Sequence, residues 1–178
     1  MMEIFWEELT SGLPDTRALV RVMLRLIAAT LLGAVVGIER ERAGKPAGLR
    51  THILVTLGTT VFVVACSSVG MSSEGVSRVI QGIATGIGFI GAGAILKLTE
   101  ERDIQGLTTA AGIWMTAAVG VAVGVGSLGV AVLSTVLTLL VLASVGSLEY
   151  RMGKGRAATD EDSHPRAGAR NDRDRGAT

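Results

Sequence analysis

The chain contains five long blocks of apolar residues, and these blocks constrain its fold more than any other feature. Each has about 17 residues or more, and about 20 helical residues cross the 30 Å hydrocarbon core of a bilayer. Backbone N–H and C=O groups in lipid must be paired within their own segment, so each block is expected to form a transmembrane helix. The sequence therefore predicts an all-α integral membrane bundle of five helices. The blocks are Ala18–Ile38, Ile53–Val69, Val79–Leu96, Leu107–Val125 and Leu128–Leu148.

The composition agrees with a membrane protein and excludes several other classes. Of the 178 residues, 48% are hydrophobic and 19% are charged, and the mean hydropathy is +0.48. The net charge of +1 gives no reason to expect nucleic-acid binding. The single cysteine, Cys66, cannot form an internal disulfide or a cysteine-based zinc site. The two histidines, His52 and His164, are too few for most histidine metal sites. We expect neither a metal site nor a cofactor.

Lysine and arginine are concentrated in every second connection between the blocks. Thirteen of them lie in the first connection (39–52), the third connection (97–106) and the tail after Glu149, and two lie on the other side. Cytoplasmic loops carry an excess of basic residues. We therefore predict that the N-terminus is outside and that the C-terminus is in the cytoplasm.

The chain is predicted to have three parts. Residues 1–17 form a periplasmic or interfacial segment, in which Trp6 acts as the anchor at the membrane surface. Residues 18–148 form the transmembrane domain. Residues 149–178 mix Arg, Asp, Gly and Ala without apolar periodicity, which indicates a disordered cytoplasmic tail. Contact of the tail's arginines with anionic lipid is the alternative interpretation.

Small residues recur at regular spacing in several blocks. Helices in lipid associate through close backbone contact between such residues. We expect a tight core of the first, third and fourth blocks, with the fifth on the lipid side. The alternative is that the glycines form thin walls around a small cavity. Eight glycines are predicted to act in helix packing: Gly33, Gly37, Gly86, Gly88, Gly91, Gly93, Gly112 and Gly120.

Residues 86–91 also match the dinucleotide-binding pattern G-x-G-x-x-G. The pattern has that meaning only between a strand and a helix of a βαβ unit. Here it lies inside an apolar block, so we interpret it as a packing motif.

Two arginines, Arg21 and Arg25, lie one turn apart in the first block. An arginine at the bilayer centre costs about 2.5–3.5 kcal/mol on insertion scales. Both side chains can extend outward to the interface, because helical side chains lean toward the N-terminus. The alternative is that Arg25 lines a polar cavity.

A cluster of charged and polar residues is predicted at the cytoplasmic ends of the blocks. Glu39 and Arg40 follow the first block, Arg50 precedes the second, and Thr108 and Thr109 open the fourth. Helix N-termini offer free N–H groups and positive dipole character, which suit an anion or the Glu39 carboxylate. We expect Glu39 and Arg50 to pair and to matter most, since charges near the membrane are poorly screened. Ordinary loop charge extending to the interface is the alternative.

Four segments occur in an order and spacing that resemble a known family. They are Gly37–Glu41, Gly48–Thr51, Gly86–Ile95 and Gly106–Trp114. The chain resembles the MgtC/SapB family of bacterial inner-membrane proteins, which includes SrpB-like and YhiD-like members. This resemblance implies a multi-pass protein of the inner (plasma) membrane. For the best-known branch it implies a role in survival at low magnesium and under acid stress, through restraint of the F-type ATP synthase and not through magnesium transport.

The chain departs from that best-known branch in two respects. The branch has a folded ACT-like cytoplasmic domain after the membrane part, whereas this chain ends in a short polar tail. We therefore expect a short form that lacks the ACT-like domain. Met115 and Thr108 also stand where the branch commonly has Cys and Asn. The simpler SapB-like or YhiD-like members are the closer match.

The function predicted from the sequence is that of a non-enzymatic membrane protein. It would modulate ion or proton homeostasis, or adaptation to low magnesium and acid, through a membrane partner such as an F-type ATP synthase. We find no nucleophile–base pair, metal set or phosphate-binding loop, so no catalytic residue is predicted. The alternatives are a small ion transporter or channel and an enzyme acting on lipid. Beyond the lipid bilayer, a second copy bound through the first or fifth block is expected in a homodimer.

Overall fold

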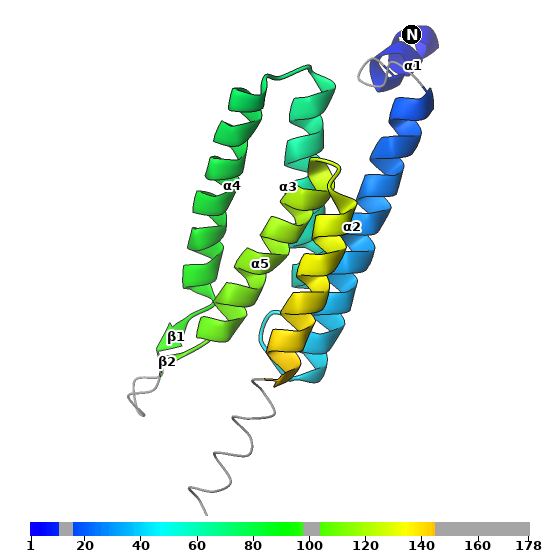
Figure 1. Cartoon of the computed structure of the whole chain (residues 1–178). Helices are drawn as coiled ribbons and strands as arrows, with labels where there is room; N and C mark the ends of the chain where they lie inside the picture. Colours follow the sequence, from blue (N-terminus) through cyan, green and yellow to red (C-terminus); the bar gives the residue numbers. More distant parts are fainter. Residues whose placement is uncertain (11–15, 98–103, 145–178) are drawn as a thin grey trace, which may run out of the picture. The chain divides into compact units, whose positions relative to one another are not determined.

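The computed structural model describes residues 1–10, 16–97 and 104–144. The chain divides into two compact units, residues 1–139 and 140–178. Of the second unit, only the helical residues 140–144 are described. The predicted tail, 149–178, lies outside the described residues. The elements are α1 (Met2–Thr10), α2 (Thr16–Arg42), α3 (Leu49–Ser68), α4 (Ser73–Gly93), β1 (Leu96–Lys97), β2 (Ile104–Gln105), α5 (Leu107–Gly124) and a further helix, Leu128–Ser144 (Figure 1).

The predicted all-helical class is confirmed. Among the described residues, three helices are long and apolar enough to cross a membrane: α2, α3 and α5. α4 has the length of a span, with 21 residues, but it contains Glu74, Arg78 and Gln81 and is not among those three. The helix Leu128–Ser144 is apolar but shorter in its described part. The two-residue strands β1 and β2, which the sequence did not predict, pair in antiparallel fashion between α4 and α5.

α3 begins four residues earlier than the apolar pattern predicted. Its N-cap residue is Gly48, and the Glu41 carboxylate accepts a hydrogen bond of 2.9 Å from the Leu49 N–H. This bond satisfies one of the N–H groups that lack a partner in the first turn of a helix. The apolar count began only at Ile53, so it assigned His52 to the connection; His52 lies instead within the helix and is fully buried.

α2 packs against α3 with almost no space between the two backbones. A Cβ added at Gly33 would collide with Thr56 Oγ1 and would lie 2.8 Å from the His52 carbonyl oxygen. A Cβ at Gly37 would lie 2.7 Å from Leu49 Cα. Real Cβ atoms essentially never approach so closely, so both positions require glycine. The backbones of α2 and α3 are thus in close contact at both glycines.

α5 packs against α3, on another side from α2. A Cβ at Gly120 would collide with Thr59 Oγ1 and would lie 2.5 Å from the Thr56 carbonyl oxygen. A Cβ at Gly124 would lie 2.6 Å from Val63 Cβ. Hydrogen bonds also cross this interface; in one of them the Thr60 hydroxyl donates to the Gly120 carbonyl at 2.8 Å. α3 is thus the helix on which both α2 and α5 pack.

The core differs from the expectation in one helix. The third apolar block was expected in the core, but in α4 a Cβ at Gly86, Gly88 or Gly93 would meet no atom within 4 Å among the described residues. At Gly91 the nearest atom is Ala110 Cβ, at an ordinary 3.6 Å. The second block, α3, takes the central place. It does so because its buried threonines present a narrow face to both neighbours.

The last helix presents a bulky apolar surface, as expected of the fifth block. Val132, Leu133 and Leu137 are exposed, while Ala131 and Thr135 are buried. Ala131 packs in one apolar cluster with Ala29 of α2 and with Val119 and Val123 of α5. Residues 128–139 therefore attach through small residues and leave their large side chains on the outside.

Arg25 binds the C-terminal end of α5. Its Nη1 donates a hydrogen bond of 2.8 Å to the Gly124 carbonyl oxygen. A Cβ at Gly126, which has φ +90°, would lie 2.6 Å from Arg25 Nη2. The last carbonyls of a helix lack partners, and a positive charge there is favourable to the helix dipole. The sequence left two interpretations of Arg25 open, extension to the membrane interface and the lining of a polar cavity, and neither describes this contact with the end of α5. Arg21, one turn away, is exposed.

The close contacts around α3 lead to a prediction about two glycines. Gly120→Ala should destabilise the bundle by about 1–3 kcal/mol, because the added methyl group overpacks the α3–α5 interface. The matched change Gly86→Ala, in the open face of α4, should be neutral or slightly stabilising. Thermal unfolding of the purified protein in detergent, followed by circular dichroism, measures both. Equal midpoints for the two variants would contradict this description of the core.

The contact of Arg25 leads to a second prediction. Arg25→Met should lower stability by about 1–2 kcal/mol, because it removes both the hydrogen bond to Gly124 and the charge at the helix end. Arg21→Met is the matched control, since Arg21 is on the same helix and is exposed. The same unfolding assay applies, and a loss of stability in Arg21→Met as large as in Arg25→Met would refute the capping role.

Candidate functional site

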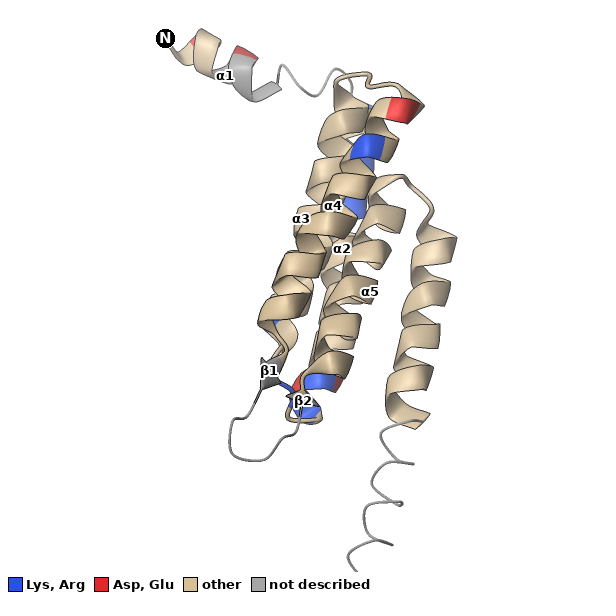
Figure 2. Ribbon diagram, turned by 90° about the vertical axis from the view of Figure 1, so that its left-hand side faces the viewer, with Lys and Arg blue, Asp and Glu red and all other residues tan. Residues whose placement is uncertain are grey.

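The five polar residues predicted as a site lie at one end of the bundle, where α2 ends and where α3 and α5 begin (Figure 2). Glu39 and Arg40 are in the last turn of α2, Arg50 is in the first turn of α3, and Thr108 and Thr109 are in the first turn of α5. Arg40 and Thr109 are buried, Glu39 is partly buried, and Arg50 and Thr108 are exposed. The structure therefore gathers these residues at one end but in different environments.

Glu39 forms its ion pair with Arg40 and not, as expected, with Arg50. Arg40 Nε donates to Glu39 Oε2 at 2.5 Å, and Nη2 donates to Oε1 at 2.7 Å. The Arg40 side chain is only 3% exposed, and a buried charge is costly unless it is paired. Arg50 is exposed on α3, so its charge does not carry this cost of burial. The need to neutralise the buried guanidinium therefore decides which arginine the carboxylate binds.

The Glu39 carboxylate also lies beside a surface hollow. The hollow has a volume of about 570 Å³ and is lined by Val35, Ile38, Glu39, Arg42, Ala43 and Leu139. Most of this lining is apolar, and Glu39 and Arg42 supply its charge. Glu39 is thus the member of the ion pair that is accessible from the surface, with a side-chain exposure of 25%.

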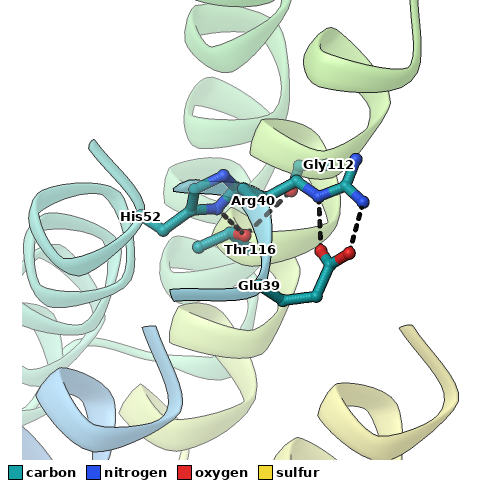
Figure 3. A network of polar contacts seen from close by, with 5 residues as sticks. All are labelled: Glu39, Arg40, His52, Gly112 and Thr116. Atoms are coloured by element: carbon teal, nitrogen blue, oxygen red, sulfur yellow. Dashed lines mark hydrogen bonds and ion pairs between the residues drawn. The ribbon is translucent and has the colours of Figure 1, made fainter. Parts of the chain in front are cut away.

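A second polar network lies at His52, where α3 meets α5 (Figure 3). His52 Nδ1 and Thr116 Oγ1 are 2.7 Å apart, and the Thr116 hydroxyl donates to the Gly112 carbonyl at 2.8 Å. Because the hydroxyl proton is used on Gly112, Thr116 can only accept a hydrogen bond from His52. Nδ1 therefore carries a proton. This bond fixes the ring between the two helices.

The other ring nitrogen has no hydrogen-bond partner among the described residues, although it is fully buried. Its ring lies against Gly112, where a Cβ would be 3.8 Å from His52 Cε1. Buried polar atoms without partners are rare. His52 is therefore the least satisfied polar group at this end of the bundle.

The sequence analysis counted His52 but did not place it in the site. The signal that could have found it is its position two residues after Arg50, next to the apolar block, because ionisable residues inside membrane spans are functional candidates by default. Thr116 lies in register with Gly112 and Gly120, so it reads as a packing residue from the sequence. Its contact with His52 comes from another helix and has no local sequence signal.

The start of α5 depends on a glycine in the left-handed conformation. Gly106 is the N-cap residue with φ +97°, and a Cβ there would collide with the Ala94 carbonyl oxygen. Only glycine adopts this geometry without strain. This turn sets the start of the helix and hence the positions of Thr108 and Thr109.

Within residues 1–10, 16–97 and 104–144, no group of three or more His, Cys, Asp or Glu side chains is placed to hold a metal ion. The polar groups at this end are instead one ion pair, one His–Thr contact and exposed charges. Their arrangement can bind a charged or hydrogen-bonding surface. It offers no pre-formed set of metal ligands in the described part of the chain.

The three helices that are long and apolar enough to cross a membrane place the chain in the class of helical membrane proteins. Residues 26–151 match the MgtC family, and the chain belongs to that family. It is 43% identical over 136 residues to "Protein SrpB" of Synechococcus elongatus, covering 70% of this chain and 75% of that protein. No solved structure matches the chain.

Two further relatives are longer than the region of similarity. The chain is 40% identical over 140 residues to "Putative magnesium transporter YhiD" of Escherichia coli, covering 73% of this chain and 63% of that protein. It is 42% identical over 117 residues to "Protein MgtC" of Salmonella typhimurium, covering 66% and 49%. The match thus spans about half the length of that MgtC protein, and the resemblance found in the sequence motifs is confirmed at the level of the family.

The His52 network predicts the behaviour of Thr116 variants. Thr116→Val should destabilise the protein by about 1–3 kcal/mol, because it leaves the buried Nδ1–H of His52 without an acceptor. Thr116→Ser keeps the hydroxyl and should retain most of the stability. Thr135→Val is the matched control, because Thr135 is also buried and, among the described residues, its hydroxyl binds only the Ala131 carbonyl of its own helix. Unfolding in detergent measures all three, and equal effects of the two valine changes would rule out this role of Thr116.

Proposed function

We propose that this chain is a non-enzymatic protein of the bacterial inner membrane with five spans. Its N-terminus is outside and its C-terminus is in the cytoplasm. It modulates ion or proton homeostasis, or adaptation to low magnesium and acid, through a membrane partner. Membership of the MgtC family supports this proposal, and three features of the structure add to it.

The first feature is the connection between the candidate spans. α3 ends at one end of the bundle and α5 begins at the other, so α4 runs the full length between them (Figure 1). Its 21 residues are about 30 Å long at 1.5 Å per residue, which matches the hydrocarbon core. α4 therefore supports a further span despite its polar residues. The apolar helix Leu128–Ser144 supports the fifth.

The second feature is the distribution of basic residues. The end of the bundle where α2 stops and α3 starts carries Arg40, Arg42, Lys45 and Arg50 (Figure 2). Lys97 of β1 follows α4 at that same end. An excess of lysine and arginine is typical of the cytoplasmic side. This distribution supports the proposed orientation.

The third feature, which carries the proposal, is that the interface of α2, α3 and α5 is closed. His52, Thr56, Thr60 and Val63 are fully buried there. The glycine contacts bring backbones together without space for water. A modulator needs such a rigid body and an accessible end surface, whereas a conducting protein needs a polar path. The packing therefore supports modulation over conduction through the interior of one copy.

The accessible surface at the basic end is where we place the contact with a partner. It includes the exposed Arg50 and Thr108 and the partly exposed Glu39 beside its hollow. Charges at the membrane boundary are screened less than charges in bulk water, which strengthens complementary contacts. An F-type ATP synthase is the first partner to test, because the resemblance to the best-known branch of the family implies it.

A small ion transporter is the second candidate function. It is favoured by the name of the relative "Putative magnesium transporter YhiD", at 40% identity. The two candidates differ in flux. Purified protein in liposomes should move neither Mg²⁺ nor protons if it is a modulator. Robust flux that is lost in Arg50→Ala would establish the transporter instead.

Partner binding predicts a selective effect of Arg50. Arg50→Ala should reduce recovery of the partner from native membranes in mild detergent, and should impair growth at low magnesium or in acid. The change should leave folding intact, because Arg50 is exposed. Lys45→Ala is the matched control, since it removes another exposed positive charge from the turn between α2 and α3 and should have a smaller effect. Unchanged recovery and growth in Arg50→Ala would reject this surface as the partner site.

A further inference from the structure

α4 carries a polar and small-residue stripe on its outward face. Six exposed residues follow one another at alternating spacings of four and three, which is the heptad spacing of a helix–helix seam. On the other side of the helix, Ile87 and Gly91 are buried against the rest of the chain. We call the six residues the α4 seam: Glu74, Arg78, Gln81, Thr85, Gly88 and Ala92.

The α4 seam is unlike the other outward faces of the bundle. α2 exposes Ile27 and Leu31, and the last helix exposes Leu133 and Leu137, as surfaces in contact with lipid tails should. None of the six seam residues has a large apolar side chain, although Phe89, which is 84% exposed, lies beside Thr85 and Ala92 on the same helix. A polar group such as the Gln81 carboxamide loses its hydrogen bonds in hydrocarbon, and leaving it without partners there is unfavourable. The seam is therefore poorly suited to lipid and well suited to another helix.

The seam also permits a close approach. A Cβ at Gly88 would meet no atom within 4 Å among the described residues, and the same is true of Gly82 and Gly86 on the flank. Small residues let two helix backbones come together in a membrane, as Gly33 and Gly120 do inside this chain. In α4 the corresponding partner is absent from the part of the chain that the structure describes.

We propose that the α4 seam is the contact surface for a second copy of this chain, in a parallel pair of α4 helices. Two copies inserted in the same orientation are related by a two-fold axis along the membrane normal, so each seam faces itself. The chemistry of the seam is self-complementary. The Gln81 carboxamide has both donors and an acceptor and can bind its counterpart reciprocally.

The charges at the outer end of α4 fit the same arrangement. Glu74 and Arg78 lie one turn apart and are each 75% exposed, with Arg78 Nη2 donating to Glu74 Oε1 at 2.6 Å. In a parallel pair, Glu74 of each copy can reach Arg78 of the other, so that two ion pairs form across the axis. Opposite charges on one seam thus favour a second copy over a partner with a uniformly charged or apolar face.

This dimer is independent of the proposed modulation of a partner complex. The basic end that we assign to the partner lies at the other end of the bundle from Glu74 and Arg78 (Figure 2). The dimer differs from the expectation from the sequence, which placed the contact of a homodimer on the first or fifth block.

Disulfide crosslinking of the purified full chain in liposomes tests the proposal, because only copies of this chain are then present. In a Cys66→Ala background, Gln81→Cys and Gly88→Cys should each form a covalent dimer on mild oxidation. Leu31→Cys is the control, since it is exposed in the middle of α2. We expect at least about tenfold more dimer at the two seam positions, as required for a specific contact. Equal crosslinking at all three positions, or only monomer, would overturn the proposal.

A charge exchange gives a second test that does not depend on the small residues. Arg78→Glu should reduce crosslinking of Gly88→Cys at least about tenfold, because it removes both diagonal Glu74–Arg78 pairs and leaves only carboxylates around the axis. Combining it with Glu74→Arg restores opposite charges and should restore the dimer. Both positions are exposed, so the unfolding midpoint of the monomer in detergent should not change. Failure of the double exchange to restore crosslinking, with folding intact, would exclude the reciprocal ion pairs and with them the proposed seam.

Discussion

The bundle depends on the contact of two glycine-bearing helices with the threonine-lined face of α3. Gly33 on α2 and Gly120 on α5 both approach Thr56, from different sides. Helices in a bilayer gain little from moving apolar side chains out of lipid, so close van der Waals contact must supply the association energy. A single added methyl group at either glycine would meet the facing helix. The positions of the other helices follow from this three-helix contact.

Such close packing limits which polar groups the interior can hold. The hydroxyls of Thr56 and Thr59 donate to backbone carbonyls of their own helix. These buried polar groups therefore have hydrogen-bond partners without needing any from the neighbouring helices. Thr60 and Thr116 form bonds between helices. The hydroxyl groups of Thr60 and Thr116 thus give direction to contacts that van der Waals forces alone would leave free to slide.

The sequence predicted the helices well because hydropathy and length decide whether a segment can lie in a bilayer. It did not predict which helix is central, because regularly spaced small residues were found in the first, third and fourth blocks, whereas the central helix packs through threonines in the second. It also missed His52, since an apolar block counted by composition begins after a polar residue even when the helix begins before it. Spacing along the chain predicts a face of a helix, but the partner of that face is a property of the whole fold.

The same limit applies to charge. Glu39 was expected to bind Arg50 because both lie near the membrane boundary. Arg40 also lies near that boundary, so this position does not decide which arginine pairs with Glu39. The burial of the arginine side chain decides it. Arg40 is enclosed by the protein and Arg50 is exposed, so the carboxylate that pairs with Arg40 removes the larger penalty of burial. Arg50 is left to the solvent-facing surface, where a charge costs little to keep and is free to bind something else. Burial thus separates the two arginines at this end of the bundle, and the exposed one is the better candidate for recognition.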